Sequence, residues 1–188
     1  MRIIAGQCRG TRLKAPKGDH TRPTSDRMRQ TLFDMLTHPV WGGTNCVQDS
    51  YVLDAFAGTG ALGLEALSRG AKSACFFENN AISKHILQEN ITHCRMQPFT
   101  KIYNNILHPP LAEQPCSLIF FDPPYRHNLI LPALTQILNK GWLSSTALLI
   151  TETAIDESLA LTKQFFLLTE RKLGVSCLRI WQYRQINE

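Results

Sequence analysis

The chain has 188 residues, 44% of them hydrophobic and 19% charged, which excludes an intrinsically disordered protein and fits one domain with a small extension. No apolar run approaches the ~18 residues of a membrane-spanning helix, and the first residues lack the apolar stretch of a signal peptide, so we expect a cytoplasmic protein. The six cysteines and six histidines lack the spacing of a metal site, so we expect neither a membrane nor a metal partner.

The net charge of +5 is concentrated at the start of the chain. Residues 1–29 hold eight basic residues against two acidic ones, a net charge of +6, which leaves −1 for the remainder. A basic end on a near-neutral body suits a phosphate-binding arm, and a solubilising tail is the competing interpretation. We accordingly divide the chain into a basic extension over residues 1–40 and a main domain over residues 41–188.

Two local elements are expected in the basic region. Residues 1–15 predict a β-hairpin with Ile3 and Ile4 on one arm and Leu13 on the other, followed by a loop over residues 16–23. Thr24 or Ser25 can cap a helix that ends near residue 39. The apolar residues of this helix fall on one face, at Met28, Leu32, Met35 and Leu36.

From residue 50 onward, strands and helices alternate. We predict strands over residues 51–56, 73–77, 100–104, 118–121 and 147–151, and helices over residues 61–69, 81–95 and 129–139. A short helical stretch over 156–162 precedes two β segments, 164–169 and 175–183, joined across 172–174. The pattern predicts an α/β, Rossmann-like fold: a mostly parallel seven-stranded sheet with an antiparallel edge strand, helices on both faces and an N-terminal β-hairpin extension.

A glycine-rich turn follows the first of these strands. Gly58, Gly60 and Gly63 match G-x-G-x-x-G between a strand and a helix, which is typical of a nucleotide-type ligand at a helix N-terminus. Glu78, 20 residues after Gly58, ends the next strand and can accept hydrogen bonds from ribose hydroxyls. Asp54 would repel a pyrophosphate but attract an ammonium group, which favours S-adenosylmethionine over NAD. The alternative is a turn whose glycines serve packing only.

Asparagine ends the third predicted strand. Asn105, with Asn104 beside it, can meet the edge of an adenine ring, and an ordinary turn asparagine is the equally weighted alternative.

The sequence Asp122-Pro123-Pro124-Tyr125 follows a strand that is expected to be buried, and its groups are the ones we expect to take part in the reaction. Two prolines cannot donate backbone hydrogen bonds, so the strand ends there in a rigid ledge with a carboxylate, bare carbonyls and one aromatic ring. Asp122 and the Pro123 carbonyl can each accept an N–H from a planar amine and stabilise its developing charge, while Tyr125 stacks on the base. Methyl transfer to an exocyclic nitrogen follows if this ledge lies next to the glycine turn. The alternative is a strand-terminating turn.

These motifs resemble class I S-adenosylmethionine-dependent methyltransferases, and most closely the RsmD family, which methylates N2 of one guanine in bacterial 16S rRNA. The similarity covers nearly the whole chain. It rests on residues 2–6 with Gly10 and Leu13, residues 22–29 with Leu32 and Phe33, residues 53–60 with 62–63 and 65–66, Glu78, residues 122–125, residues 141–143 and Glu152.

The resemblance implies a role for each motif. The catalytic positions are Asp122, Pro123, Pro124 and Tyr125. The cofactor positions are Asp54, Ala55, Phe56, Ala57, Gly58, Thr59, Gly60, Leu62, Gly63, Glu78, Asn79, Asn105 and Ile106. The RNA-binding positions are Arg2, Arg9, Arg12, Lys14, Arg22, Pro23, Thr24, Arg27 and Arg29.

Some positions depart from the family or stay open. Asn105 stands where relatives often have aspartate, and Asn79-Asn80 also varies. We expect Glu65 to be exposed or helix-stabilising and Glu152 to be a supporting or structural residue.

The expected function is methyl transfer from S-adenosylmethionine, yielding S-adenosylhomocysteine, to a guanine N2 amine in 16S rRNA. The expected partner is 16S rRNA in the small subunit or an assembly intermediate, and the expected state is a monomer. The competing functions are methylation of adenine N6 in nucleic acid, methylation of a glutamine amide in protein, and non-catalytic RNA binding.

Overall fold

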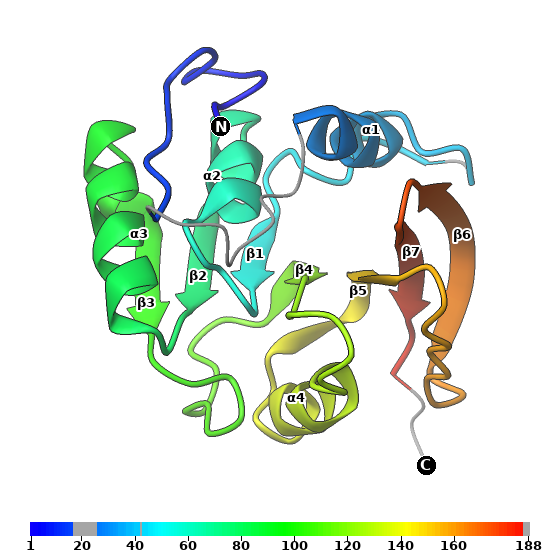
Figure 1. The fold of residues 1–188 in the computed structure, drawn as a ribbon. Helices are drawn as coiled ribbons and strands as arrows, with labels where there is room; N and C mark the ends of the chain where they lie inside the picture. Colours follow the sequence, from blue (N-terminus) through cyan, green and yellow to red (C-terminus); the bar gives the residue numbers. More distant parts are fainter. Residues whose placement is uncertain (17–25, 42, 186–188) are drawn as a thin grey trace.

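A seven-stranded sheet with the order β3-β2-β1-β4-β5-β7-β6 forms the centre of the computed structural model, which describes residues 1–16, 26–41 and 43–185 (Figure 1). The strands are β1 (Tyr51–Asp54), β2 (Ser73–Phe77), β3 (Thr100–Tyr103), β4 (Cys116–Phe121), β5 (Leu143–Ala154), β6 (Phe165–Leu173) and β7 (Ser176–Tyr183). β1 to β5 pair in parallel, and β7 runs antiparallel to both β5 and β6. The predicted fold class is therefore confirmed, and the strand order reverses between β1 and β4.

Helices cover both faces of the sheet (Figure 1). They are α1 (Asp26–Thr37), α2 (Ala61–Ser68), α3 (Ala81–His93) and α4 (Ile130–Asn139), with a 3-10 turn over Gln97–Phe99. Alternate residues of one strand point to opposite faces: Leu118 and Phe120 join the core under α1, α2 and α3, whereas Ile119 and Phe121 join the core under α4. Burial of both faces explains why β4 reads as a continuous apolar run.

The first residues form a small hairpin that packs on the α2 and α3 side of the sheet. Arg2 and Arg12 form one antiparallel bridge, and the Ile3 N–H donates to the Thr11 carbonyl at 2.9 Å. Ile3 and Leu13 are buried in the same core as α1, so the predicted hairpin is confirmed and its apolar residues attach it to the body.

Glu65 of α2 holds this hairpin in place. Its side chain has no exposed surface, and it accepts the Ile4 N–H at 2.7 Å, the Ala5 N–H at 3.0 Å and the Arg69 Nε–H at 2.7 Å. Of the two expectations for Glu65, exposure is wrong because the carboxylate is buried with three donors around it, and a helix-stabilising role is confirmed by its i,i+4 ion pair with Arg69.

Three other local expectations change. The predicted helix over 156–162 is absent: residues 155–164 form turns and irregular structure, and the Glu157 carboxylate accepts the Ala154 N–H at 2.9 Å and the Arg126 N–H at 3.1 Å. Such a short segment gains too few helical bonds to offset the cost of helix nucleation.

The strand predicted over 147–151 extends over 143–154 because β4 and β7 pair with it on both sides, and the turn of the last hairpin lies at 174–175. The proposed caps Thr24 and Ser25 lie outside the described residues.

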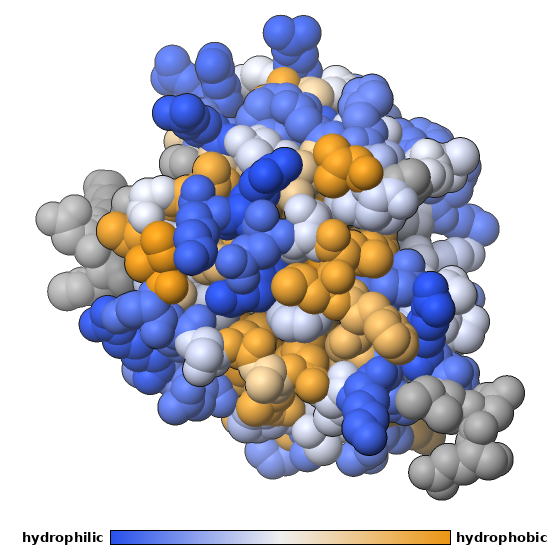
Figure 2. All heavy atoms as spheres, turned by 90° about the vertical axis from the view of Figure 1, so that its right-hand side faces the viewer, coloured by the Kyte–Doolittle hydropathy of each residue, from blue (hydrophilic) through white to orange (hydrophobic). Residues whose placement is uncertain are grey.

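β6 forms one edge of the sheet, and Figure 2 shows apolar side chains on this side of the molecule. Phe166 and Leu167 are about half exposed, and the Arg184 guanidinium lies over the Phe166 ring at 5.1 Å from its centroid. In the part of the chain that the structure describes, no helix has both the length and the apolar character to cross a membrane.

Candidate active site

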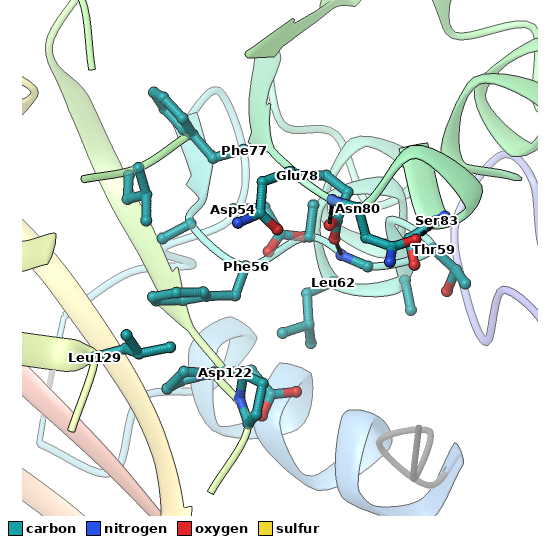
Figure 3. Close-up of a pocket in the computed structure, with 18 of the residues that line it drawn as sticks. Asp54, Phe56, Thr59, Leu62, Phe77, Glu78, Asn80, Ser83, Asp122 and Leu129 are labelled. Carbon is teal, nitrogen blue, oxygen red and sulfur yellow. Dashed lines mark hydrogen bonds between the residues drawn. The ribbon is translucent and has the colours of Figure 1, made fainter. Parts of the chain in front are cut away.

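One cavity of about 680 Å³ opens at the carboxyl ends of the parallel strands (Figure 3). Residues 54–59 of the glycine turn and residues 122–125 of the proline ledge both line it. The two motifs are 64 residues apart between Gly58 and Asp122, but β1 and β4 are neighbouring strands, which brings their ends together. The spatial requirement on which the sequence interpretation depended is therefore met at the point where strand order reverses.

The three glycines of the turn have different roles. Gly58 lines the cavity and has a φ of +53°, in the left-handed region that favours glycine. Gly60 and Gly63 are absent from the described cavity wall. A Cβ on Gly60 would lie 2.4 Å from Leu87, and one on Gly63 would lie 2.3 Å from the Phe76 ring. The packing interpretation thus holds for Gly60 and Gly63, and the ligand-facing interpretation fits Gly58.

Asp54 ends β1 beneath the turn. It is 1% exposed, and its Oδ2 accepts the Gly63 N–H at 3.0 Å, so the carboxylate ties the strand end to the start of α2. Burial raises the pKa of Asp54 to about 7; the Gly63 hydrogen bond opposes this shift and the nearby Glu78 charge adds to it. A bound cation would offset this cost and stabilise the ionised form.

Glu78 follows β2 and faces the same turn (Figure 3). Its two oxygens accept the Gly58 N–H at 2.8 Å and the Asn80 N–H at 2.7 Å. Asn80 in turn caps α3 by accepting the Ile82 and Ser83 N–H groups, each at 3.0 Å. Glu78 therefore fixes the glycine turn and the start of α3 and lies on the cavity wall, and its ribose contact stays a prediction.

The charge of the cavity identifies the ligands it suits. Four acidic side chains line it, those of Asp54, Glu78, Asp122 and Glu152, and the described lining residues include no lysine, arginine or histidine. Such a site disfavours a pyrophosphate and favours a ligand with positive charge. The lining therefore fits S-adenosylmethionine, whose sulfonium and ammonium groups are cationic, better than NAD.

The rest of the wall is apolar or carries amides. Phe56, Leu62 and Ile106 were expected here or beside the turn, and all three line the cavity. Asn79 and Asn105 also line it, but Asn105 Oδ1 accepts the Leu107 N–H at 2.9 Å, so part of this side chain stabilises its own turn. Asn105 Nδ2 lies 3.3 Å from His108 Nδ1, so both polar atoms of the side chain have partners in the turn, and the contact with an adenine edge stays a prediction.

The ledge after β4 presents its groups to the cavity and is held from behind. Asp122 is partly exposed; Figure 3 shows it across the cavity from Asp54 and Glu78. The Tyr125 hydroxyl donates to Glu152 Oε1 at 2.5 Å and lies 2.6 Å from Ser176 Oγ. Burial and the Glu152 bond raise the pKa of Tyr125, so its hydroxyl stays protonated and engaged. The ring face is the part of Tyr125 left for a ligand.

The proposed RNA-binding residues separate into three groups. Arg2, Arg9, Arg12, Lys14 and Arg27 are exposed, as phosphate contact requires. Arg29 is fully buried and donates to the Arg2 carbonyl at 2.6 Å and to Asp26 Oδ1 at 2.8 Å, so we no longer assign it to RNA. Its guanidinium links the hairpin to α1. Arg22, Pro23 and Thr24 lie outside the described residues.

Sequence reasoning missed several cavity residues. Met1, Ala15 and Pro16 of the basic arm form part of the wall, together with Phe77, Asn80, Ser83, Leu107 and Leu129. Phe77 directly precedes Glu78 and Asn80 follows two residues after it, so this carboxylate was a usable signal for both. The first residues gave no such signal, because their place depends on how the arm folds back over α2 and α3. Within the described ranges no cluster of three His, Cys, Asp or Glu side chains is arranged to hold a metal ion.

Comparison with known proteins places this architecture in a family. The family model described as "Conserved hypothetical protein 95" matches residues 1–182. The chain is 35% identical over 186 residues to ribosomal RNA small subunit methyltransferase D of Escherichia coli strain K12, covering 97% of this chain and 89% of that protein. It is 33% identical over 187 residues to the protein of the same name from Haemophilus influenzae, covering 97% and 93%.

Solved structures share the fold. The putative methyltransferase yhhF from Escherichia coli superimposes with a TM-score of 0.82 at 34% identity, over 98% of each chain. An RNA methyltransferase from Salinibacter ruber in complex with S-adenosyl-L-homocysteine shares the fold with a TM-score of 0.65 at 9% identity, over 89% and 97% of the chains. The chain therefore belongs to the RsmD family, that of ribosomal RNA small subunit methyltransferase D, which makes it a methyltransferase of the class that uses S-adenosylmethionine.

Proposed function

We propose that this protein transfers a methyl group from S-adenosylmethionine to the exocyclic N2 amine of a guanine in 16S rRNA. The observation that carries the proposal is the shared cavity, in which the acidic glycine turn and the Asp122–Tyr125 ledge lie on opposite sides. The relatives named for the small ribosomal subunit support rRNA as the substrate class.

The donor side of the cavity binds and orients the cofactor. Glu78 presents a carboxylate suited to ribose hydroxyls, and the buried Asp54 places negative charge beneath the turn. The bound cofactor supplies an electrophilic methyl group on its sulfonium. Because the reacting groups are held in one cavity, positioning provides much of the rate.

The acceptor side orients the amine. The lone pair of a base NH₂ is delocalised into the ring, so the amine must be held with that lone pair directed at the methyl group. Asp122 and the Pro123 carbonyl accept its N–H groups and stabilise positive charge as it develops. The ring of Tyr125, held by Glu152 and Ser176, provides a face on which the base stacks.

The exposed basic residues of residues 1–16 and Arg27 of α1 provide phosphate contacts. Replacing Arg12 or Arg27 by glutamate should weaken RNA binding and lower the slope of log affinity against log salt by about 1 for each lost contact. An unchanged slope would show that the arm does not meet phosphates. Charge reversal at Glu113, which is exposed and absent from the described cavity wall, is the control.

The decisive experiment supplies labelled S-adenosylmethionine to small subunits, to protein-free 16S rRNA, to DNA and to total protein. We expect label in 16S rRNA from cells that lack this protein, recovered as N2-methylguanosine after digestion to nucleosides. Label recovered as N6-methyladenosine, or only in protein, would reject the proposed acceptor while keeping a methyltransferase. No transfer from a preparation that binds the cofactor would favour a non-catalytic RNA-binding role.

A further inference from the structure

The N-terminal arm, residues 1–16, is attached to the body at several places, and side chains of α2 and of α3 supply two of them. At the first, Glu65 and Ser68 of α2 bind its backbone: Glu65 accepts two N–H groups, and Ser68 Oγ accepts the Cys8 N–H at 3.0 Å and donates to the Ala5 carbonyl at 2.5 Å. Neither Glu65 nor Ser68 belongs to the described lining of the cavity. This attachment therefore holds the arm without touching the active site.

The second attachment is Asn90 of α3. Its side chain is 1% exposed and makes three hydrogen bonds. Asn90 Oδ1 accepts the Lys14 N–H at 2.8 Å, and Nδ2 donates to the Lys14 carbonyl at 3.1 Å and to the Thr59 carbonyl at 2.9 Å. One buried amide thus joins the end of the arm to the glycine turn.

Both segments held by Asn90 contribute to the cavity. Thr59 lines it from the turn, and Ala15 and Pro16, directly after Lys14, line it from the arm. Loss of this partly buried amide network would leave the Lys14 and Thr59 carbonyls and the Lys14 N–H to find other partners, which costs stability where water does not replace the amide. The ordered arm is therefore part of the wall that meets the cofactor.

We propose that Asn90 is a positioning residue that couples the N-terminal arm to the cofactor cavity, so that cofactor binding and RNA binding strengthen each other. A cofactor that packs against the turn and the arm stabilises the arrangement in which all three Asn90 bonds are made. RNA held by Arg9 and Arg12 of the same arm stabilises that arrangement too. By thermodynamic linkage the two effects are reciprocal. The RNA half of this inference rests on the proposed function; the cofactor half does not.

The cofactor half is tested by calorimetry with S-adenosylhomocysteine and no RNA. Asn90→Ala should weaken binding about tenfold, because the turn and the arm lose their shared partner. Asn90→Asp should weaken binding comparably, since a carboxylate still accepts the Lys14 N–H but cannot donate to either carbonyl. Ser68→Ala is the matched control, because it loosens the arm at the other attachment, and it should change affinity less than twofold. Affinity within twofold for Asn90→Ala, or an equal loss for Ser68→Ala, overturns the inference.

A measurement on the unaltered chain covers the case in which the Asn90 variants fail to fold. Hydrogen exchange with and without S-adenosylhomocysteine should show the Lys14 N–H slowed by the ligand. The Ile4 and Ala5 N–H groups, bonded to Glu65, should change less. Equal slowing at both attachments, or none at Lys14, contradicts a coupling through Asn90.

The RNA half is tested by measuring cofactor affinity with and without saturating 16S rRNA. RNA should tighten S-adenosylhomocysteine binding about fivefold or more in the wild type and leave it nearly unchanged in Asn90→Ala. If Asn90→Ala keeps the same ratio of cofactor affinity with RNA to cofactor affinity without RNA, the inference is overturned. A purely structural role would lower stability without removing this ratio. If 16S rRNA neither binds nor becomes methylated, the proposed function fails, whereas the calorimetry and exchange results still decide the role of Asn90.

Discussion

The glycine turn and the Asp122–Tyr125 ledge are both turns at strand ends on one cavity, but they are stabilised in opposite ways. In the glycine turn, backbone N–H groups donate to carboxylates at the ends of two neighbouring strands, as Gly63 does to Asp54 of β1 and Gly58 does to Glu78, which follows β2. In the ledge, Pro123 and Pro124 have no N–H to donate. The ledge is held instead through the Tyr125 hydroxyl, by Glu152 of β5 and Ser176 of β7.

This difference indicates a division of labour. The donor side is fixed by hydrogen bonds from its own backbone N–H groups to carboxylates and is preorganised for a cofactor. The acceptor side keeps its carboxylate and its aromatic face directed into the cavity and depends on distant strands for support. Substitutions on the donor side should therefore change mainly cofactor affinity, and substitutions on the ledge should change mainly turnover.

The largest expected effect comes from Asp122→Ala. Loss of the acceptor should lower turnover about 10²–10³-fold, because the amine is no longer oriented and its developing charge is no longer stabilised. Affinity for S-adenosylhomocysteine should stay within about threefold, since the donor side is intact. Single-turnover kinetics and calorimetry on one preparation measure both. A parallel loss of cofactor affinity would remove the distinction between the two sides.

Asp54→Asn tests whether the buried carboxylate binds positive charge. With the pKa of Asp54 near 7, wild-type affinity for S-adenosylmethionine should fall by up to about tenfold per pH unit below pH 7, because the cation binds the ionised form. The variant should bind about 10- to 30-fold more weakly at pH 8 and show little pH dependence there and below. Calorimetry across this range measures how affinity changes with pH in the wild type and in the variant. The same pH dependence in both would exclude Asp54 as its origin.

The same substitution should stabilise the unliganded protein. The folded pKa of Asp54 lies above its ordinary value of 3.8. The contribution of this group to stability is therefore most favourable at low pH and is lost as the pH rises toward and through 7. Asparagine removes this cost and can still accept the Gly63 N–H. At pH 8 the free energy of unfolding of Asp54→Asn should therefore be about 1–3 kcal/mol higher than that of the wild type, as measured by urea denaturation without cofactor.

Glu78→Gln should weaken cofactor binding by about tenfold. A glutamine has one carbonyl oxygen, so it cannot accept the Gly58 and Asn80 N–H groups as two carboxylate oxygens do, and its NH₂ would face one of these donors. Calorimetry with S-adenosylhomocysteine measures the loss. Glu113→Gln, an exposed residue paired with Lys101, serves as control. An unchanged affinity would mean that the turn does not need this carboxylate.

The smallest effect is expected for Tyr125→Phe. The ring remains, but its bonds to Glu152 and Ser176 are lost, so turnover should fall about three- to tenfold with cofactor affinity unchanged. Glu152→Gln keeps an acceptor for the hydroxyl and should cost less than Glu152→Ala. Steady-state kinetics on the three variants give this order. A larger loss in cofactor affinity than in turnover would show that the ledge supports the donor side.

Much of the site was predictable because its signals are local. Three motifs each predict the local backbone geometry around them: a glycine turn between a strand and a helix, an acidic residue after the next strand, and two prolines after a buried strand. Parallel pairing then forces their ends to one edge of the sheet. Arg29 shows the limit of such reasoning: as one of eight basic residues in residues 1–29 it resembled a phosphate ligand, yet its position on α1 directs it into the interior, onto the Arg2 carbonyl.

The sequence by itself determined the order of strands and helices, the cavity edge and the carboxylates on it, because periodicity and turn chemistry act over a few residues. Only the tertiary structure decided which side chains support them. Glu152 and Ser176 reach Tyr125 from 27 and 51 residues away, and Asn90 reaches Lys14 from 76 residues away. A pattern marks a residue as buried or polar, but the identity of its partner is set by how distant elements pack, and local sequence does not contain that information.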